Sequence, residues 1–455
     1  MPNVNIVDGR LPRTEPKEVG ISPDAILTLI KGAKEQNLEL HSLMVLRHGK
    51  VAAEGWWAPY QPTYRHLLWS VSKSFTSTAI GFAISEGLLT IQDKVLSFFP
   101  EYAPADPSPN LEAMTLWHLI TMTTGQDADD IYAMAATGEP WEKCFLARPV
   151  PNPPGSKFFY NSTATYMLSS ILQKKTGQDL MEYLKPRLFD PLEITEATWQ
   201  KNPQGVTAGG WGLSLATESI AKFGQLYLQR GVWNGEQLLP KGWVEEATAK
   251  QVENGTEPDS DWDQGYGYQF WRSRFGAYRG DGMYGQFCVV DEAREAVVAI
   301  TANSDVLQPI LNLVWPLLAS YDSQTTSNQE ELESTLTTLE IKGPEGQINQ
   351  EKSAKYTSKE GPLELDFKDD SLEVKWPIDD QPFHIGKGHW IEGAYKGERV
   401  AAWGAWTEPN VFETRVQSLE QALHATIRFQ FEGQNLTVER TARTLNETLF
   451  VGQIA

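Results

Sequence analysis

Cysteines are scarce in this sequence, and leader segments and long apolar runs are absent. The only two cysteines, Cys144 and Cys288, lie far apart, which favours buried free thiols in a reducing compartment over a disulfide framework. No uninterrupted apolar stretch is long enough to span a membrane. The first residues, MPNVNIVDGRLPRTEPKEVG, have neither a basic start nor an apolar core, so they do not form a secretory signal. We therefore expect a cytoplasmic protein with no membrane partner.

Positive charge is scarce as well. The 39 Lys and Arg residues stand against 59 Asp and Glu, which gives a formal net charge of −20. Because binding to a phosphate backbone requires clustered Lys and Arg, this balance excludes a nucleic-acid partner. A hydrophobic content of 41% with 22% charged residues is typical of a soluble globular protein, and 455 residues favour two domains.

Several motifs of other enzyme classes are missing. There is no G-x-S-x-G, no H-E-x-x-H and no P-loop, and the His and Cys residues lack zinc-binding spacing. A G-x-G-x-x-G does occur at residues 280–285. The following QFCVVDEAREAVVAI predicts a strand, a turn and a strand, whereas a dinucleotide site requires a helix. We therefore expect neither a metal nor an organic cofactor.

The pattern of elements predicts a mixed α/β domain over residues 1–321. SPDAILTLIKGAKEQ is an amphipathic helix, and the two apolar runs around RHGK form a β-hairpin. Residues from about 93 to 264 are mostly helical, and the aromatic and β-branched runs after them are strands, closed by the apolar helix LQPILNLVWPLLASY. Strands at both ends with helices between them indicate one sheet built from both termini, with a helical insertion.

The C-terminal part has a different character. The polar segment 322–343 is predicted as a linker. From 344 to 455 the sequence alternates between apolar and polar residues, interrupted by D-D, P-N and G-Q turns. This pattern predicts a small all-β domain, either a barrel or a sandwich.

The segment LLWSVSKSFTSTAIGFAIS contains a single charged residue, Lys73. Its neutral, mostly apolar or small residues predict a buried helix, on which Ser70 and Lys73 share a face three residues apart. Because burial disfavours a charged amine, Lys73 would be a neutral base able to take the proton of the Ser70 hydroxyl. Ser70 also lies near a helix N-terminus, where unpaired N–H groups can bind an oxyanion.

A second S-x-x-K stands at Ser219 and Lys222, so the spacing alone does not identify a site. This copy lies on an amphipathic helix with Glu218 and Lys222 at i,i+4 spacing, which predicts a solvated face. The buried context is therefore what favours the copy at Ser70.

At this point the chain resembles a known family. WSVSKSFTSTAIGFAISEGLLTIQDKVLSFFPEY, MTLWHLITMTTG, FFYNSTATYMLSSILQKKTG, LFDPLEI, GGWGLSLATESIAKFGQLYLQRGVWNGEQLLP and GMYGQFCVV are similar, in order and spacing, to the serine β-lactamase and penicillin-binding protein superfamily. The nearest branch is class C-like, with family VIII esterases and 6-aminohexanoate-dimer hydrolases. The resemblance spans about residues 20 to 320. It implies a β-lactamase-like fold: an antiparallel sheet flanked by helices plus an all-helical subdomain, to which the all-β C-terminal domain is an addition.

The resemblance also implies roles for particular residues. Ser70 matches the acylated nucleophile, Lys73 the lysine of S-x-x-K, and Tyr160 the tyrosine of Y-x-N, which shares acid and base work with the lysine. The backbone N–H groups of Ser70 and Met283 match the oxyanion hole. We expect Lys73 to supply the cation that a phenol needs to act near neutrality. On this basis Asn161, Ser162 and Gly282 are assigned to substrate binding.

Two departures from the family pattern stand out. Y-x-N reads Tyr160-Asn161-Ser162, so that Ser162 either bonds Ser70 or Lys73, or caps the following helix together with Asn161. K-T-G reads Gly280-Asp281-Gly282, so the cation that engages a substrate carboxylate is missing. Strand alternation points the adjacent Arg279 to the other face.

Some other residues are given weaker roles. Asp281 is a candidate to meet a substrate ammonium, although a solvated turn position is the better interpretation, and His118 is interpreted as a helix histidine rather than a base. Trp211, Trp56, Trp57 and Trp141 are candidates to line the pocket.

We expect a serine hydrolase that forms an acyl-enzyme with a small or medium-sized ester or linear amide. A β-lactamase or D-amino acid peptidase is the alternative within enzymes. A non-catalytic penicillin-binding-like ligand or scaffold module is the alternative outside them. The expected partner is a small-molecule substrate, and the oligomeric state is left open.

Overall fold

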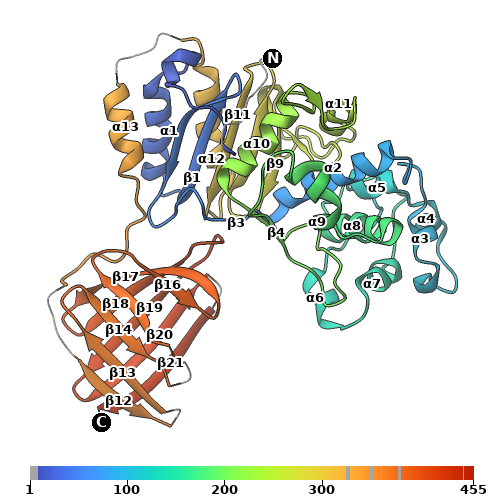
Figure 1. The fold of residues 1–455 in the computed structure, drawn as a ribbon. Coiled ribbons are helices and arrows are strands. Elements are labelled where there is room, and N and C mark those ends of the chain that lie inside the picture. The colour runs from blue at the N-terminus through green and yellow to red at the C-terminus, as the bar shows by residue number, and fades with distance from the viewer. Residues whose placement is uncertain are drawn as a thin grey trace. The chain divides into compact units, whose positions relative to one another are not determined.

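The computed structural model describes residues 9–323, 328–348, 353–359, 361–377, 381–443 and 445–454. The chain divides into two compact units (Figure 1). The first comprises the residues through Gly55 together with Leu67–Thr337, and the second comprises Trp56–His66 and the residues from Thr338 onward.

This division differs from the expected boundaries at two places. Trp56–His66, expected in the first domain, belongs to the second unit, where the Tyr60 hydroxyl donates a 2.7 Å hydrogen bond to the Ser418 carbonyl. The expected linker contains helix α13 (Gln329–Thr337), which belongs to the first unit.

The first unit is built on a six-stranded sheet. Its strand order is β2 (Lys50–Trp56), β1 (Leu40–Arg47), β11 (Ala296–Ala302), β10 (Gln286–Asp291), β9 (Tyr278–Gly282) and β8 (Trp271–Arg272). The pairings of β1 with β11, of β10 with both β11 and β9, and of β8 with β9 are antiparallel. Strands from the start and the end of the unit therefore share one sheet, as predicted.

The sheet is covered by helices, which is why its central strands are buried along their whole length. Helix α10 (Thr217–Leu228) packs against β1, β10 and β11. Helices α1 (Pro23–Glu35) and α12 (Gln308–Ala319) pack against one another and lie with α13 at one side of the unit (Figure 1).

The helical insertion is confirmed between the two halves of the sheet. Helix α2 (Ser72–Ser85) is buried almost throughout and packs against α8 (Ser162–Thr176), α9 (Leu180–Leu184) and β9. The other elements of the unit are α3 (Val95–Phe98), α4 (Pro109–Ala113), α5 (Leu116–Ile120), α6 (Ile131–Ala136), α7 (Trp141–Ala147), α11 (Trp243–Thr248), the 3-10 turns η1 (Pro16–Val19), η2 (Trp69–Val71), η3 (Pro100–Tyr102) and η5 (Arg274–Gly276), the π turn η4 (Lys185–Phe189) and the short strands β4 (Thr198–Trp199), β5 (Leu213–Leu215), β6 (Val232–Trp233) and β7 (Glu236–Gln237). Strand β3 (His66–Leu67) lies where the chain returns from the second unit to the first.

The second unit is a ten-stranded barrel. Its strands are β12 (Ala354–Ser358), β13 (Gly361–Phe367), β14 (Ser371–Lys375), β15 (Phe383–Lys387), β16 (Ile391–Tyr395), β17 (Glu398–Glu408), β18 (Val411–Ser418), β19 (His424–Glu432), β20 (Asn435–Ala442) and β21 (Leu445–Ile454). They form one sheet, which the parallel pairing of β15 with β17 closes. Buried aromatic rings fill the interior, with Trp406 within 5.5 Å of the ring centroids of Phe367, Phe412 and Phe431. Of the two expected all-β forms, the barrel is therefore confirmed.

Candidate active site

Ser70 and Lys73 meet at the start of α2. Ser70 lies in the 3-10 turn η2 that leads into the helix, and Lys73 lies in its first turn. Lys73 Nζ donates to Ser70 Oγ at 2.9 Å, to Ser162 Oγ at 3.1 Å and to the Gly210 carbonyl at 2.7 Å. The lysine is only 1% exposed, so its amine lies beside the hydroxyl and out of bulk water.

Burial sets the protonation state of this amine. Loss of solvent lowers the pKa of Lys73 from its ordinary 10.5 to about 7, against the opposing charges of Asp129 and Asp281. Near neutral pH a large fraction of Lys73 is therefore a neutral amine at hydrogen-bond distance from a hydroxyl. Such a pair can remove the proton of Ser70.

Tyr160 lies on the other side of the same pair. Its ring centroid is 4.8 Å from Lys73 Nζ, and its phenol shares a hydrogen bond with Ser70. Burial raises the pKa of Tyr160 well above 10, and the bond to Ser70 only partly opposes this shift. The expectation that Lys73 supplies a cation to make this phenol act near neutrality is therefore wrong. Tyr160 is a neutral O–H group that can hand a proton on.

The two residues after Tyr160 have different roles, one as a helix cap and the other as a hydrogen-bond partner of Lys73. Asn161 caps α8, since its side-chain oxygen accepts from the Ala164 N–H at 3.1 Å. Asn161 is fully buried and also bonds Gln126 at 3.2 Å, so it faces the protein interior. Ser162 is the one that reaches Lys73.

Strand β9 lies directly against the segment that carries the serine. A side chain at Gly282 would place its Cβ only 2.2 Å from the Leu68 carbonyl oxygen, so the close approach requires glycine. The structure thus gives Gly282 a packing contact two residues before Ser70. Met283 follows at the β9–β10 turn, where its side chain is 51% exposed.

Tyr160 is surrounded by a cluster of aromatic residues. These residues were not predicted from the sequence to belong to the site. The ring of Trp271 stacks on Tyr160 at 5.2 Å, and Tyr266 and Phe158 pack against Trp271. The aromatic run GYGYQFW supplies two of these residues, so its density in aromatics was the signal that could have identified them.

Of the tryptophans proposed for the pocket, Trp211 directly follows Gly210, whose carbonyl accepts from Lys73. Trp56 and Trp57 pack in the second unit, and Trp141 contacts Trp211 and Tyr166. His118 is a helix histidine as interpreted: its Nδ1 accepts from the Thr115 N–H at 2.9 Å, and burial lowers its pKa to about 4.

Four residues close to the site in sequence or in space have a left-handed backbone conformation. Trp69, Met122, Gln269 and Tyr284 have φ angles of 50°, 60°, 64° and 67°, a region that costs a residue other than glycine about 1–3 kcal/mol. Trp69 directly precedes Ser70, and Tyr284 directly follows Met283. Nine further non-glycine residues of the described chain also have positive φ, among them Asn37, Arg230 and Lys396, so these angles do not by themselves identify the site.

Asp281 is not a solvated turn residue. It lies within β9, is 7% exposed, and accepts a 3.0 Å hydrogen bond from Arg279 Nε through Oδ2. Burial raises the pKa of Asp281 to about 6, although the nearby Arg279 charge and its hydrogen bonds act in the opposite direction. Arg279 points to the face of β9 opposite that of Gly280 and Gly282, as predicted. Asp281 lies on the same face as Arg279.

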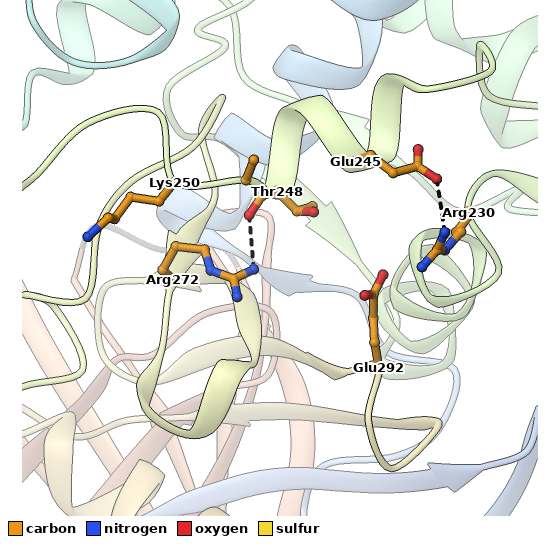
Figure 2. A pocket seen from close by; sticks show the side chains of 7 residues that line it. Arg230, Glu245, Thr248, Lys250, Arg272 and Glu292 are labelled. Carbon is orange, nitrogen blue, oxygen red and sulfur yellow. Dashed lines mark hydrogen bonds and ion pairs between the residues drawn. The ribbon is translucent and has the colours of Figure 1, made fainter.

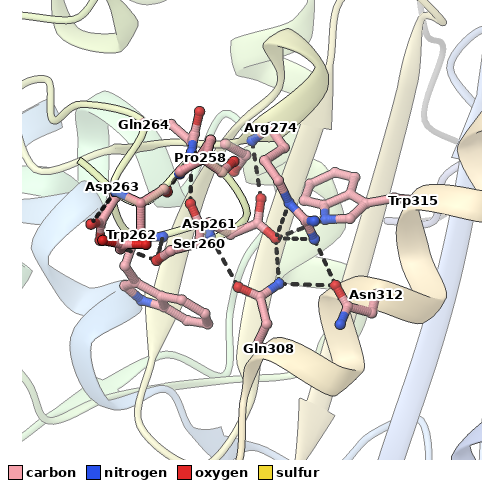
Figure 3. Close-up of polar contacts among 12 residues, drawn as sticks. Pro258, Ser260, Asp261, Trp262, Asp263, Gln264, Arg274, Gln308, Asn312 and Trp315 are labelled. Atoms are coloured by element: carbon pink, nitrogen blue, oxygen red, sulfur yellow. Dashed lines mark hydrogen bonds and ion pairs between the residues drawn. The ribbon is translucent and has the colours of Figure 1, made fainter. Parts of the chain in front are cut away.

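Asp261 is a buried residue whose carboxylate binds three neighbouring side chains (Figure 3) and whose backbone carbonyl holds Arg279. Its Oδ2 accepts from Arg274, Gln308 and Trp315, and its backbone carbonyl accepts from Arg279 Nη1 at 2.8 Å. Although burial raises it, the hydrogen bonds of these neighbours hold the pKa of Asp261 below its usual value.

An open pocket of about 350 Å³ lies apart from this chemistry (Figure 2). Its lining is polar and carries charges of both signs, and it contains neither Ser70 nor any residue that contacts Lys73. Within it Arg272 donates to the Thr248 carbonyl at 3.0 Å, and Arg230 pairs with Glu245 at 3.5 Å. A further lining residue, Lys250, pairs with Glu253 outside the pocket at 2.6 Å.

The described residues lack two features, a metal site and a membrane-spanning helix. Among them, no set of three or more His, Cys, Asp and Glu side chains is arranged to hold a metal ion. No helix in the described part of the chain has the length and apolar character needed to cross a membrane.

The chain is similar to hydrolases and penicillin-binding proteins. It is 28% identical over 320 residues to the 6-aminohexanoate-dimer hydrolase of Paenarthrobacter ureafaciens, which covers 64% of this chain and 80% of that protein. The structure of the octameric penicillin-binding protein homologue from Pyrococcus abyssi matches 95% of this chain and 99% of its own, with a TM-score of 0.53 at 16% identity.

A third similar structure is that of EstCE1, a hydrolase with promiscuous acyltransferase activity. It matches 66% of this chain and 99% of its own, with a TM-score of 0.51 at 15% identity. Residues 29–322 match the family model described as Beta-lactamase. That match spans the six-stranded sheet, the helical insertion and Ser70 with its partners, and the chain therefore belongs to the beta-lactamase family of hydrolases.

Proposed function

We propose that this hydrolase works through a covalent acyl-enzyme on Ser70. The observation that carries the proposal is the buried Lys73 amine 2.9 Å from the Ser70 hydroxyl. In acylation Ser70 Oγ attacks the substrate carbonyl while Lys73 Nζ takes the hydroxyl proton. Tyr160, bonded to Ser70 and beside Lys73, gives its phenol proton to the leaving group and receives the proton that Lys73 took from Ser70, which restores both groups for deacylation.

Deacylation reverses these proton transfers. Water attacks the acyl carbonyl, loses a proton to Lys73, and Ser70 Oγ recovers its hydrogen as the acid is released. The backbone N–H groups of Ser70 and Met283 hold the negative oxygen in both steps. The close packing of Gly282 on Leu68 supports this assignment, because it brings the end of β9 to the serine segment.

We propose an ester or an unstrained linear amide of small to medium size as the substrate. The name of the Paenarthrobacter relative, a 6-aminohexanoate-dimer hydrolase, supports a linear amide, and the similarity to EstCE1 supports an ester. A penicillin or a peptide ending in D-alanine is less well supported, because Gly280 stands where the family carries the cation for a carboxylate.

Covalent labelling tests the proposal. A fluorophosphonate should add one mass to the intact protein, map to Ser70 in a peptide digest, and leave Ser70→Ala unmodified. A panel of p-nitrophenyl esters, linear amides, D-amino amides and nitrocefin then assigns the substrate class. A protein that neither labels nor turns over any member of the panel is a non-catalytic ligand or scaffold module.

A further inference from the structure

Arg279 and Asp281 form a buried ion pair on the strand that ends at the site. Arg279 Nε and Nη2 lie 3.0 and 2.9 Å from Asp281 Oδ2. Both residues precede Met283, whose amide is the proposed oxyanion donor. The pair occupies a part of the strand where the family carries a hydroxyl and a single cation, so its charge pattern differs from the family's.

The position of the pair relative to Tyr160 follows from strand register. Trp271 on β8 is the register partner of Arg279 on β9, so their side chains lie on the same face. The Arg279 guanidinium carbon lies 5.8 Å from the Trp271 ring centroid, and Trp271 stacks on Tyr160. Asp281, two residues along, shares that face. The ion pair therefore lies on the side of β9 where Tyr160 lies.

Of the two members of the ion pair, the Asp281 carboxylate lies closer to the proposed oxyanion donor Met283. Asp281 is two residues from Met283, whereas Arg279 is a further two residues away, roughly 7 Å at the usual strand rise. Asp281 is 7% exposed and Arg279 is 0% exposed, so of the two side chains only that of Asp281 keeps any exposed surface. The guanidinium is also committed elsewhere, because its Nη1 donates to the Asp261 carbonyl at 2.8 Å and to Ser273 Oγ at 2.6 Å.

A carboxylate can hold Arg279 and a second partner. Arg279 uses Oδ2 and Trp262 donates a further hydrogen bond to the carboxylate, which offers about four acceptor positions on its two oxygens, so that positions remain for a substrate group. Asp129 adds a second negative charge nearby, held at the start of α8 by the N–H groups of Ser162 and Thr163. The fixed charges around Ser70 thus favour a positive group on the substrate and oppose a negative one.

We propose that Asp281 is the specificity-determining group of this site and selects acyl compounds that carry an ammonium group. The proposal rests on the acyl-enzyme function given above and adds the charge of the substrate to it. Arg279 is the positioning residue that holds the carboxylate in place, itself fixed by Asp261. A substrate carboxylate would be repelled by Asp281, whose partner Arg279 is already engaged with it.

The test compares p-nitrophenyl esters that differ only at the end of the acyl chain. Chains of two to six carbons ending in an ammonium, a methyl or a carboxylate group are assayed at pH 8, with spontaneous hydrolysis subtracted. Wild-type kcat/KM should follow the order ammonium, methyl, carboxylate for at least one chain length. In Asp281→Asn the ammonium-to-methyl ratio should fall by about tenfold or more, as expected for loss of a charge-assisted hydrogen bond.

Both kcat/KM values in the ammonium-to-methyl ratio are measured on the same protein sample, so the fraction of active enzyme cancels. A partly misfolded variant therefore still gives a valid ratio. Asp281→Glu, which keeps the charge, should retain a preference for the ammonium ester. Asp259→Asn, an exposed carboxylate on the loop before β8, makes the same change in net charge and should leave the ratio unchanged.

Two results would overturn the proposal. The first is an equal ammonium-to-methyl ratio in wild type and Asp281→Asn. The second is a uniform loss of kcat on all three esters in Asp281→Asn, which would make the pair a support for Tyr160. Either result leaves the acyl-enzyme function standing as long as the methyl-ended ester is hydrolysed and Ser70 is labelled. Loss of labelling refutes that function instead.

Discussion

The two S-x-x-K copies of this chain have the same spacing, and the lysine of each copy is buried. The copies differ in the groups that their serine and lysine side chains contact. Lys222 is 2% exposed and Ser219 is 4% exposed, so the solvated face predicted for the second copy is wrong. Burial lowers the pKa of Lys222, as it does that of Lys73. Removal of water from a lysine is therefore common to both copies and does not by itself define a site.

Hydrogen-bond partners separate the copies. Lys222 Nζ donates to the carbonyls of Leu192 and Glu193 at 2.8 and 3.2 Å, while the Ser219 hydroxyl donates to Glu196 at 2.6 Å. The predicted i,i+4 partner Glu218 instead pairs with Arg13 at 2.6 Å. Only in the first copy does the amine meet the hydroxyl. A buried amine becomes a base for serine when the two are in contact.

Replacing the two serines should give the largest contrast. Ser70→Ala should lower kcat on a p-nitrophenyl ester by at least about 10³-fold, since the attacking oxygen is gone. Ser219→Ala should stay within about twofold of wild type, because its hydroxyl serves only Glu196. Steady-state kinetics on purified variants checks both. Comparable losses in the two variants would mean that the copies are not distinguished by the amine–hydroxyl contact.

Replacing the two lysines should separate activity from stability. Lys73→Met should lower kcat by about 10²–10⁴-fold through loss of the base. Lys222→Met should keep kcat but lose about 1–3 kcal/mol of unfolding free energy, because two carbonyls lose their donor. Kinetics and urea denaturation of the same preparations measure both quantities. A Lys222→Met protein that is stable but inactive would contradict this division.

The pH dependence of acylation should follow the Lys73 amine. The neutral form is the active one, so the acylation rate should rise with pH through a midpoint of about 7 and level off above it. Pre-steady-state bursts with a p-nitrophenyl ester give this rate. A rate that still climbs toward pH 10.5, the ordinary lysine pKa, would mean that burial does not perturb the amine.

The lowered pKa of Lys73 also makes the unfolding free energy depend on pH. Between pH 7 and 10.5 the unfolded chain holds a proton on Lys73 that the folded protein has released. The unfolding free energy of wild type relative to Lys73→Met should therefore rise with pH across that window. Denaturation at three pH values measures the slope, and a difference that falls with pH would contradict the depressed pKa.

The smallest effect is expected from Ser162→Ala. Ser162 Oγ accepts from the Lys73 ammonium and so stabilises its charged form. Without it the midpoint of the acylation profile should move to lower pH by a fraction of a unit, with kcat at the plateau changed by less than about tenfold. A shift to higher pH would mean that Ser162 acts on the neutral amine.

The fold was largely predictable because it depends on local patterns. The apolar run before and after Lys73 predicted a buried helix, and the runs around RHGK and after residue 265 predicted strands of one sheet. The alternation of apolar and polar residues in the C-terminal domain predicted an all-β fold, but it did not decide between a barrel and a sandwich. The place of Trp56–His66 was not predictable, since its partners in the second unit lie more than 280 residues away, as with the contacts of Ala58 with Leu339 and of Tyr60 with Ser418.

The site was predictable only in part for the same reason. The contact of Lys73 with Ser70 is local, whereas its bond to the Gly210 carbonyl joins residues 137 positions apart. The burial of Asp281 and of Lys222 depends on helices and loops distant in sequence. A polar residue beside two glycines, or on an amphipathic helix, has the same local pattern whether or not such a segment covers it.

Direct titration of the Lys73 amine tests the central claim most closely. Lysine labelled with ¹³C at Cε is followed by NMR from pH 5 to 11, and the signal of Lys73 is assigned by its loss in Lys73→Arg. The account predicts a midpoint of about 7 for this signal. A midpoint near 10.5, the value of a lysine in water, would contradict it.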